Sequence, residues 1–426
     1  MLNLQAYCAY ARVGQYLMAT VTEIRSLFPA LSRKVYGKDL VYFDNAATSH
    51  RSQEVIDTWN RISIESNANI HRAVHRLADE ATQAYEASRD AVKDFLNALY
   101  REEIVFTSGT TAAVNLVAFS FGEAFVGEGD EVIVTEAEHH SNIVPWQMMC
   151  RRKGAVLKVL PVDDSGHLMV EKLDELLSER TRIVAVTHIS NVLGLVNPVE
   201  EIIDKCHSAG VPVLVDGAQG IVHCQVDVQD LDCDFYVFSG HKMYAATGTG
   251  VLYGKKKWLD AMPPYMGGGE MVGTVTFAET TYAPLPMKFE AGTQNFASTA
   301  TLKPAIKLFN LLNNNELKQY ESEIRDYLLD VFLHDDRITL YGVPRGTNEE
   351  KIPLFSFSVR GVHHEDLALI LDKMGIAVRS GQMCAEPLMD RFGVTGMLRV
   401  SLAPYNTMQE AEYFVKCLNK AIDMLI

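Results

Sequence analysis

The sequence predicts an α/β protein in which a large domain with a mostly parallel sheet precedes a smaller α+β domain. Three observations lead to this prediction. Short apolar runs alternate with helical patterns between residues 103 and 253, as in a parallel sheet covered by helices. Polar residues cluster just after these runs, where open α/β sheets bind their ligands. From residue 338 onward, strands alternate with helices in a second, shorter region.

The elements of the large domain follow one another in a regular order. We expect helices over residues 110–121 and 199–209. The apolar runs predict strands at residues 103–107, 131–135, 155–160, 181–187, 211–215, 234–238 and 251–253. Residues 263–300 are rich in Gly and Pro, which predicts irregular structure with room for one hairpin.

The C-terminal part begins with a helical stretch over residues 302–333, with a turn at the three asparagines 313–315. Strands are expected at 354–359 and 398–402. We therefore divide the chain into an N-terminal extension (1–19), a segment packing with the small domain (20–38), the large domain (39–300) and the small domain (301–426).

Composition excludes several classes of function. The 39 basic and 54 acidic residues give a net charge of −15, which disfavours binding to nucleic acid or to anionic lipid. No apolar run approaches the roughly 20 residues of a membrane helix, so no membrane association is expected. The first twenty residues lack the basic leader of a secretory signal; an extension or a true start at Met18 explains them.

The seven cysteines are few and unpatterned, with no CxxC pair. They predict neither a zinc site nor a disulfide framework, and no metal is expected. A reducing cytoplasm fits this usage.

Two residues at strand ends carry the first chemical signals. Lys242 follows the strand 234–238 among small and apolar neighbours, where a lowered pKa would free its amine to form an imine with an aldehyde. Asp216 follows three apolar residues, and a buried carboxylate needs a partner such as a ring nitrogen. A solvated lysine and a helix-capping aspartate are the plain alternatives.

Two further segments complete the pattern. Ser108–Ala112, between a strand and a helix, offers an anion site or an ordinary cap at Thr110 or Thr111. His139 lies in a pair of histidines that point in different directions, so stacking on a flat cofactor is a better use than metal binding. Together the four signals match the needs of pyridoxal phosphate: an amine, an acid, a phosphate cradle and a stacking ring.

At this point the chain, from about Val21 to its C-terminus, resembles the class V aminotransferase superfamily and, within it, the group II cysteine desulfurases of the SUF type. The segments that carry the resemblance are FDNAATS (43–49), HRAVHR (71–76), SGTT (108–111), EHHSNIVPWQ (138–147), THISNVLG (187–194), VDGAQ (215–219), DCDFYVFSGHKMY (232–244), FEAGTQN (289–295) and AVRSGQMCAEPLM (377–389). The resemblance implies fold type I of the pyridoxal phosphate enzymes, with a seven-stranded sheet.

The resemblance also implies roles toward the cofactor. Lys242 would bind it covalently, His139 would stack on its pyridine ring, Asp216 would pair with the ring nitrogen, and Gln219 would contact the phenolic oxygen. The phosphate would be held by Thr110, Thr111, Ser239 and His241. Thr293 would reach the phosphate of the other subunit, which implies a homodimer.

Toward the substrate, Asn191 and Arg399 would hold the carboxylate of L-cysteine, with Arg379 close by. Lys242, His139 and Cys384 form the expected catalytic set, with Cys384 accepting the sulfur as a persulfide and alanine leaving. The sulfur would pass to a SUF-type carrier protein for iron–sulfur cluster assembly.

The resemblance leaves alternatives and shows two departures. A selenocysteine lyase, a sulfinate desulfinase, another aminotransferase or an inactive scaffold would share these motifs. Two histidines commonly precede the cysteine in the family, where this chain has Gln382 and Met383. After Tyr244, the usual Gly-Pro is replaced by Ala245 and Ala246, which predicts a less rigid turn.

Overall fold

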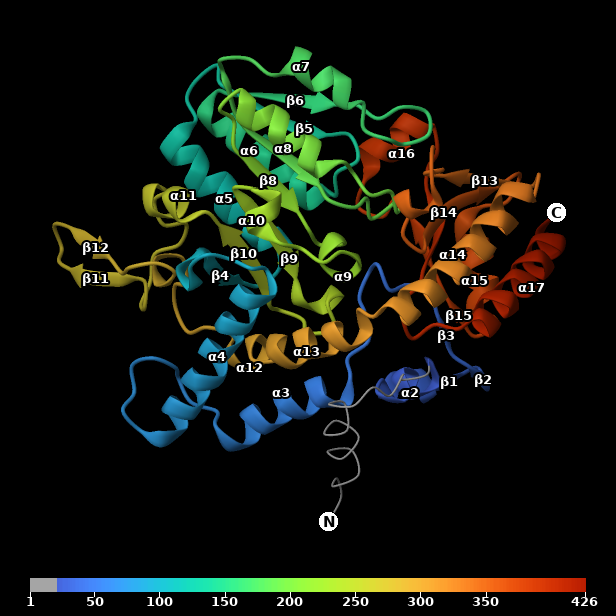
Figure 1. Ribbon diagram of the computed structural model, residues 1–426, viewed down its shortest axis with the longest axis horizontal. Helices are drawn as coiled ribbons and strands as arrows, with labels where there is room; N and C mark the ends of the chain where they lie inside the picture. The colour runs from blue at the N-terminus through green and yellow to red at the C-terminus, as the bar shows by residue number, and fades with distance from the viewer. Residues whose placement is uncertain (1–20) are drawn as a thin grey trace.

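The computed structural model describes residues 21–426, so the predicted extension 1–19 lies outside the described residues. At its centre is a seven-stranded sheet in the order β4-β10-β9-β8-β7-β5-β6 (Figure 1). The strands are β4 (Ile104–Thr107), β5 (Glu131–Thr135), β6 (Val156–Leu160), β7 (Thr181–Thr187), β8 (Val213–Asp216), β9 (Phe235–Ser239) and β10 (Gly250–Gly254). Strand β10 runs opposite to the other six strands of this sheet, which confirms the predicted mostly parallel arrangement.

Helices cover both faces of this sheet. Successive residues of a strand point to opposite faces, and here both sets are apolar, so both faces are buried. Val132 and Val134 pack on one face with helices α5 (Thr110–Phe125) and α6 (Val144–Lys153). Ile133 packs on the other face, together with α4 (Arg76–Phe95), α8 (Val199–Ser208) and α13 (Leu302–Leu312). The strands are apolar on both faces, which explains why they appear as continuous apolar runs in the sequence.

The C-terminal region has its own antiparallel sheet, in the order β13-β14-β17-β16. Its strands are β13 (Ile338–Tyr341), β14 (Leu354–Val359), β16 (Arg379–Gly381) and β17 (Met397–Ser401). Helices α14 (Asn315–His334), α15 (His364–Lys373) and α17 (Met408–Leu425) pack against it around a separate apolar core. The helical stretch expected over 302–333 is two helices, α13 and α14, which meet at the asparagine turn.

The start of the described chain contacts this C-terminal region. Strand β3 (Val41–Tyr42) pairs in parallel with β15 (Ile376–Ala377). Arg25 forms an ion pair with Glu410 at 2.8 Å. The domain boundaries drawn from the sequence stay predictions.

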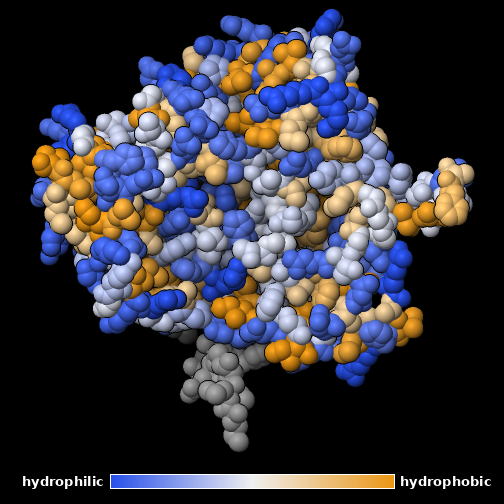
Figure 2. Space-filling model, turned by 180° about the vertical axis from the view of Figure 1, so that it is seen from behind, coloured by the Kyte–Doolittle hydropathy of each residue, from blue (hydrophilic) through white to orange (hydrophobic). Residues whose placement is uncertain are grey.

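The remaining elements are short or peripheral. A hairpin of β11 (Val272–Val275) and β12 (Thr280–Tyr282) projects from the large region (Figures 1 and 2). Phe277, in the turn between these strands, is fully exposed. The other helices and strands are α2 (Val21–Ser26), β1 (Lys34–Val35), β2 (Lys38–Asp39), α3 (Gln53–Glu65), α7 (Leu173–Leu176), α9 (Gly220–His223), α10 (Val228–Leu231), α11 (Lys256–Ala261), α12 (Phe296–Thr299) and α16 (Glu386–Phe392). Within residues 21–426, no helix combines the length and apolar character needed to cross a bilayer.

Candidate active site

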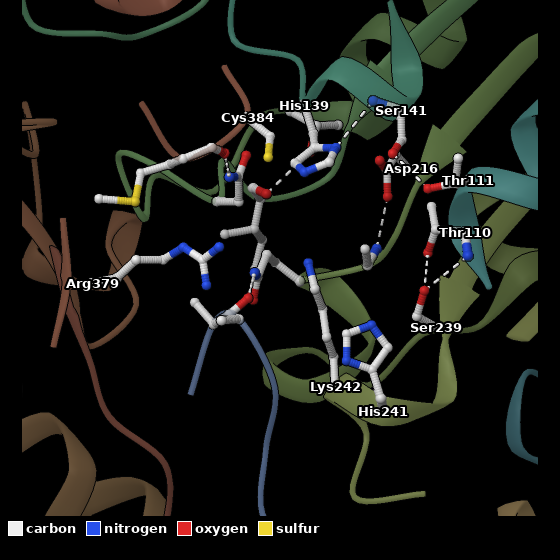
Figure 3. A pocket seen from close by; sticks show the side chains of 18 of the residues that line it. Thr110, Thr111, His139, Ser141, Asp216, Ser239, His241, Lys242, Arg379 and Cys384 are labelled. Atoms are coloured by element: carbon white, nitrogen blue, oxygen red, sulfur yellow. Dashed lines mark hydrogen bonds between the residues drawn. The ribbon is translucent and has the colours of Figure 1, made fainter. Parts of the chain in front are cut away.

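The carboxyl ends of β4, β5, β7, β8 and β9 open into one cavity of about 190 Å³ (Figure 3). Twelve residues singled out from the sequence line it: Thr110, Thr111, His139, Asn191, Asp216, Gln219, Ser239, His241, Lys242, Arg379, Cys384 and Arg399. Thr293 does not line this cavity; it is exposed on the loop before α12. The topology brings the strand-end residues together, since parallel strands end at one edge of a sheet.

Lys242 lies in a short 3-10 turn directly after β9, and its amine points into the cavity (Figure 3). Among the described residues, none hydrogen-bonds this amine. Burial lowers the pKa of Lys242 to about 8, although the negative charge of Asp216 opposes the shift. The turn that follows is held by a bond from Ala245 N–H to Gly240 C=O and one from Ala246 N–H to the Thr301 hydroxyl.

Asp216 and His139 face the same cavity from β8 and from the segment after β5. Burial raises the pKa of Asp216, opposed by a hydrogen bond from Ala218 N–H and by the charge of Lys242. Burial, and secondly the charge of Lys242, lower the pKa of His139 to about 4. Nδ1 of His139 accepts from Ser141 N–H at 3.0 Å, so the neutral ring carries its proton on Nε2.

A buried carboxylate that the sequence reasoning missed holds the His139 segment in place. Glu138 is fully buried and accepts hydrogen bonds of 2.7 Å each from the Thr135 hydroxyl, the Asn142 amide and Thr187 N–H. These bonds tie the segment to the ends of both β5 and β7. The acidic residue beside the histidine pair was the available signal.

Hydroxyl groups gather at the N-terminus of α5, at the far end of the cavity (Figure 3). The Ser239 hydroxyl accepts a hydrogen bond from Thr110 N–H at 2.8 Å, and the hydroxyls of Thr111 and Ser141 hydrogen-bond to each other at 2.6 Å. Ser141 was not anticipated from the sequence. Gly109 has a φ of 151°, and a Cβ there would lie 3.2 Å from the Ser239 oxygen, so only glycine fits this turn easily.

Two arginines of the C-terminal sheet form the opposite wall. Arg379 of β16 and Arg399 of β17 are direct cross-strand partners. Asp44 contacts both guanidinium groups, Arg399 at 3.2 Å and Arg379 at 3.5 Å. Arg399 also donates to Asn191 C=O at 2.7 Å, and its buried Nε has no partner among the described residues. Burial lowers the pKa of Arg399 to about 10.

Cys384 is exposed on the loop between β16 and α16, with its sulfur facing the cavity (Figure 3). Met383 and Cys384 both adopt left-handed backbone conformations, with φ of 53° and 55°. The side chain of Asn191 donates to Met383 C=O at 2.9 Å, so in this structure that amide holds the loop.

The profile of the family described as "Aminotransferase class-V" matches residues 41–414. The chain belongs to this family. This class V aminotransferase is 46% identical over 406 residues to a cysteine desulfurase of Enterobacter sp. (strain 638), covering 95% of this chain and 99% of that protein.

Other relatives agree. A probable cysteine desulfurase of Vibrio cholerae is 44% identical over 96% of this chain and all of its own. The solved structure of a cysteine desulfurase from Escherichia coli superimposes with a TM-score of 0.88 at 38% identity, covering 96% of this chain and 100% of that one. The solved structure of a cysteine desulfurase from Thermococcus onnurineus NA1 superimposes with a TM-score of 0.90 at 34% identity, covering 96% of this chain and 100% of that one.

Membership in the class V aminotransferases implies pyridoxal phosphate, and the residues present fit that cofactor. The cavity offers an amine that no residue within 21–426 hydrogen-bonds, a buried carboxylate, a flat neutral imidazole, and hydroxyls at a helix N-terminus whose dipole favours an anion. Those are the groups needed for its aldehyde, ring nitrogen, ring face and phosphate.

Proposed function

We propose that this class V aminotransferase is a cysteine desulfurase that converts L-cysteine to L-alanine and keeps the sulfur as a persulfide on Cys384. One observation carries the proposal: the exposed thiol of Cys384 opens into the same cavity as the amine of Lys242. A transaminase has no need of a thiol there. The names and high coverage of the relatives support the same activity.

Pyridoxal phosphate would be held by Lys242, with Asp216 at its ring nitrogen, His139 on its ring face and Gln219 beside its phenolic oxygen. Its phosphate would lie among the hydroxyls and imidazole of Thr110, Thr111, Ser239 and His241. When bound, the cofactor supplies an electron sink for the charge left on the substrate as its α-proton departs.

The chain's own residues then have defined tasks. Arg399 orients the substrate carboxylate with help from Arg379 and Asn191, which places the substrate sulfur toward Cys384. The amine of Lys242, with a pKa of about 8, accepts the α-proton. The Cys384 thiolate attacks the substrate sulfur; an S–S bond forms as the Cβ–S bond breaks, and protonation of the remainder gives alanine.

The proposal extends to the assembly and the location of the protein. We propose a homodimer in which Thr293 reaches the phosphate of the other subunit; its exposure and the apolar tip of the β11–β12 hairpin support this. The persulfide sulfur would pass to a SUF-type carrier for iron–sulfur cluster assembly. The six cysteines within residues 21–426 are all free thiols, which supports a reducing cytoplasm.

The test compares Cys384→Ala with the wild type and with Cys417→Ala, a buried cysteine in α17. We expect Cys384→Ala to keep the visible absorbance of the bound cofactor but to form no alanine from L-cysteine with a reductant present. Cys417→Ala should behave as wild type. Alanine formation by Cys384→Ala at the wild-type rate would refute the persulfide route and favour a lyase that needs no thiol.

A further inference from the structure

His140, the second histidine of the pair, does not line the cavity but contacts the Cys384 loop twice. Its backbone N–H donates to Cys384 C=O at 2.7 Å. Its ring Nε2 accepts from Glu386 N–H at 3.0 Å. One residue of the large region therefore holds the loop at two points directly after the Cys384 side chain, the Cys384 carbonyl and the Glu386 amide.

The loop needs such contacts, because its backbone is unfavourable on its own. Met383 and Cys384 are consecutive non-glycine residues with positive φ, a conformation that L-residues avoid unless the surroundings impose it. Beyond His140, the loop is held by the Asn191 amide at Met383 C=O and by its own bond from Ala385 N–H to Gln382 C=O.

We propose that His140 is a positioning residue that fixes Cys384 in the orientation required to attack the substrate sulfur. The inference rests on the proposed function. The tautomer follows from the geometry: since a backbone N–H always donates, Nε2 must be the acceptor and the neutral ring carries its proton on Nδ1.

The segment that carries His140 is held in place by a buried residue, Glu138. Glu138 ties this segment to β5 and β7, and it accepts from Asn142 two residues beyond His140. His139 turns into the cavity toward the cofactor, while His140 turns to the loop. Adjacent residues on one rigid segment thus set where the cofactor ring and the sulfur acceptor lie relative to each other.

The decisive variants are His140→Gln and His140→Asn, studied in the cofactor-loaded protein. Both keep the backbone bond to Cys384. The Gln side-chain oxygen reaches the place of Nε2 and can accept from Glu386 N–H, whereas the Asn oxygen reaches only the place of Nδ1. In His140→Asn, we expect the amide proton of Glu386 to exchange with solvent about tenfold faster than in the wild type. The kcat for cysteine should fall about tenfold, while KM and the visible spectrum of the bound cofactor stay unchanged. His140→Gln should restore both.

A second pair of variants tests the same hydrogen bond by changing its donor, Glu386, in place of its acceptor. Glu386 is the first residue of α16, a position where proline is tolerated, so Glu386→Pro deletes the N–H donor. Glu386→Ala keeps the N–H and loses only the side chain, which contacts Gln382. Glu386→Pro should reproduce the kcat loss of His140→Asn, and Glu386→Ala should not.

Two results would overturn the inference: wild-type exchange and kcat in His140→Asn, or equal losses in the Asn and Gln variants. Amide exchange is measured without turnover, so it tests the grip independently. A wild-type protein that forms no alanine would refute the proposed function, while the difference in exchange between the two variants would still show whether the His140 ring holds the Cys384 loop.

Discussion

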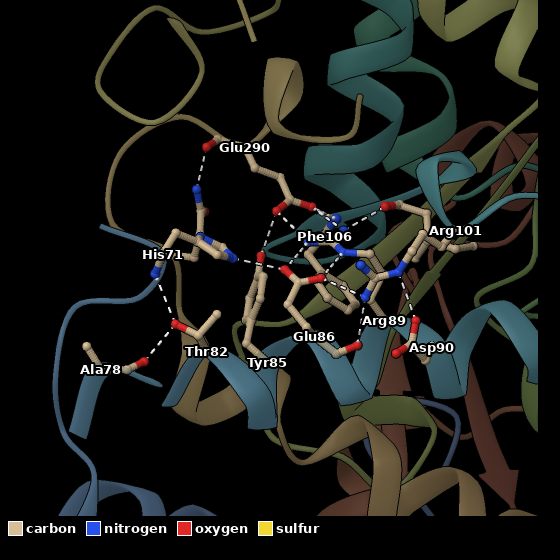
Figure 4. A network of polar contacts seen from close by, with 12 residues as sticks. His71, Ala78, Thr82, Tyr85, Glu86, Arg89, Asp90, Arg101, Phe106 and Glu290 are labelled. Atoms are coloured by element: carbon tan, nitrogen blue, oxygen red, sulfur yellow. Dashed lines mark hydrogen bonds and ion pairs between the residues drawn. The ribbon is translucent and has the colours of Figure 1, made fainter. Parts of the chain in front are cut away.

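The buried ion pair between Glu290 and Arg89 gives the sharpest prediction about stability (Figure 4). The Glu290 side chain is fully buried and lies in the segment that leads to Thr293. It accepts hydrogen bonds from Arg89 Nη1 and Nη2 at 2.7 and 2.9 Å, from the Tyr85 hydroxyl at 2.8 Å and from Phe106 N–H at 2.8 Å. The carboxylate thus joins α4, β4 and the loop before α12.

Glu290→Gln keeps the shape of the side chain but removes its charge. Arg89, 1% exposed, then keeps its hydrogen bond to Ile104 C=O and, among the described residues, Glu86 as its one acidic partner, at 3.1 Å and itself 20% exposed. Removing one member of a buried ion pair costs about 3–5 kcal/mol. Because Glu86 stays, we expect a loss at the lower end, about 3 kcal/mol in the free energy of unfolding.

Urea unfolding followed by circular dichroism measures this loss. The wild type, Glu290→Gln, Arg89→Met and the double variant form a thermodynamic cycle. Since the double variant leaves no unpaired buried charge, its loss should be smaller than the sum of the single losses by at least about 1 kcal/mol. A loss below about 1 kcal/mol for Glu290→Gln, or strict additivity, would refute the reasoning.

Three further predictions concern the cavity and its surroundings. Gly250→Ala would place a Cβ 2.4 Å from Gly109 Cα, so the Gly109 turn, where we propose that the phosphate binds, must shift; titration of the apoprotein should show pyridoxal phosphate binding weakened about tenfold or more. Arg399→Lys should raise KM for cysteine about tenfold or more, and Arg379→Lys, at a side chain 43% exposed, should raise it less; the reverse order would contradict the carboxylate site. Burial lowers the pKa of His188 to about 4, so the unfolded chain binds protons first on acidification. The free energy of unfolding should therefore fall from pH 6.5 to 4, and less steeply in His188→Asn; equal slopes would refute this.

The strand-end residues could be predicted from the sequence because their positions follow from topology. Asp216 and Lys242 end neighbouring parallel strands, so an apolar run followed by a polar residue was enough to place them at one edge. Arg379 and Arg399 come from the C-terminal sheet and Cys384 from the loop after β16, and no local pattern indicates that this region faces the cavity. Only the resemblance to a family brought them into the expected site.

Individual hydrogen-bond partners could not be predicted from the sequence either, because they too depend on which distant segments meet in the fold. The Asn191 amide donates to Met383 C=O, a contact that the sequence did not indicate, while its role at the substrate carboxylate stays a prediction. Gln219 donates to Ala46 C=O, a partner 173 positions away in the chain. Such contacts depend on how distant segments pack, which neither periodicity nor composition encodes.

The register of the C-terminal sheet gives the cavity a positively charged wall that suits a carboxylate. Arg379 and Arg399 stand directly opposite each other on β16 and β17, and like charges in that relation destabilise a sheet. Asp44, from the chain segment after β3, contacts both and offsets part of the repulsion. One carboxylate for two guanidinium groups leaves the wall net positive, and the buried Nε of Arg399 still lacks an acceptor among the described residues. A substrate carboxylate bound at this wall would supply the missing charge, so its binding would relieve a repulsion that the strand pairing itself creates.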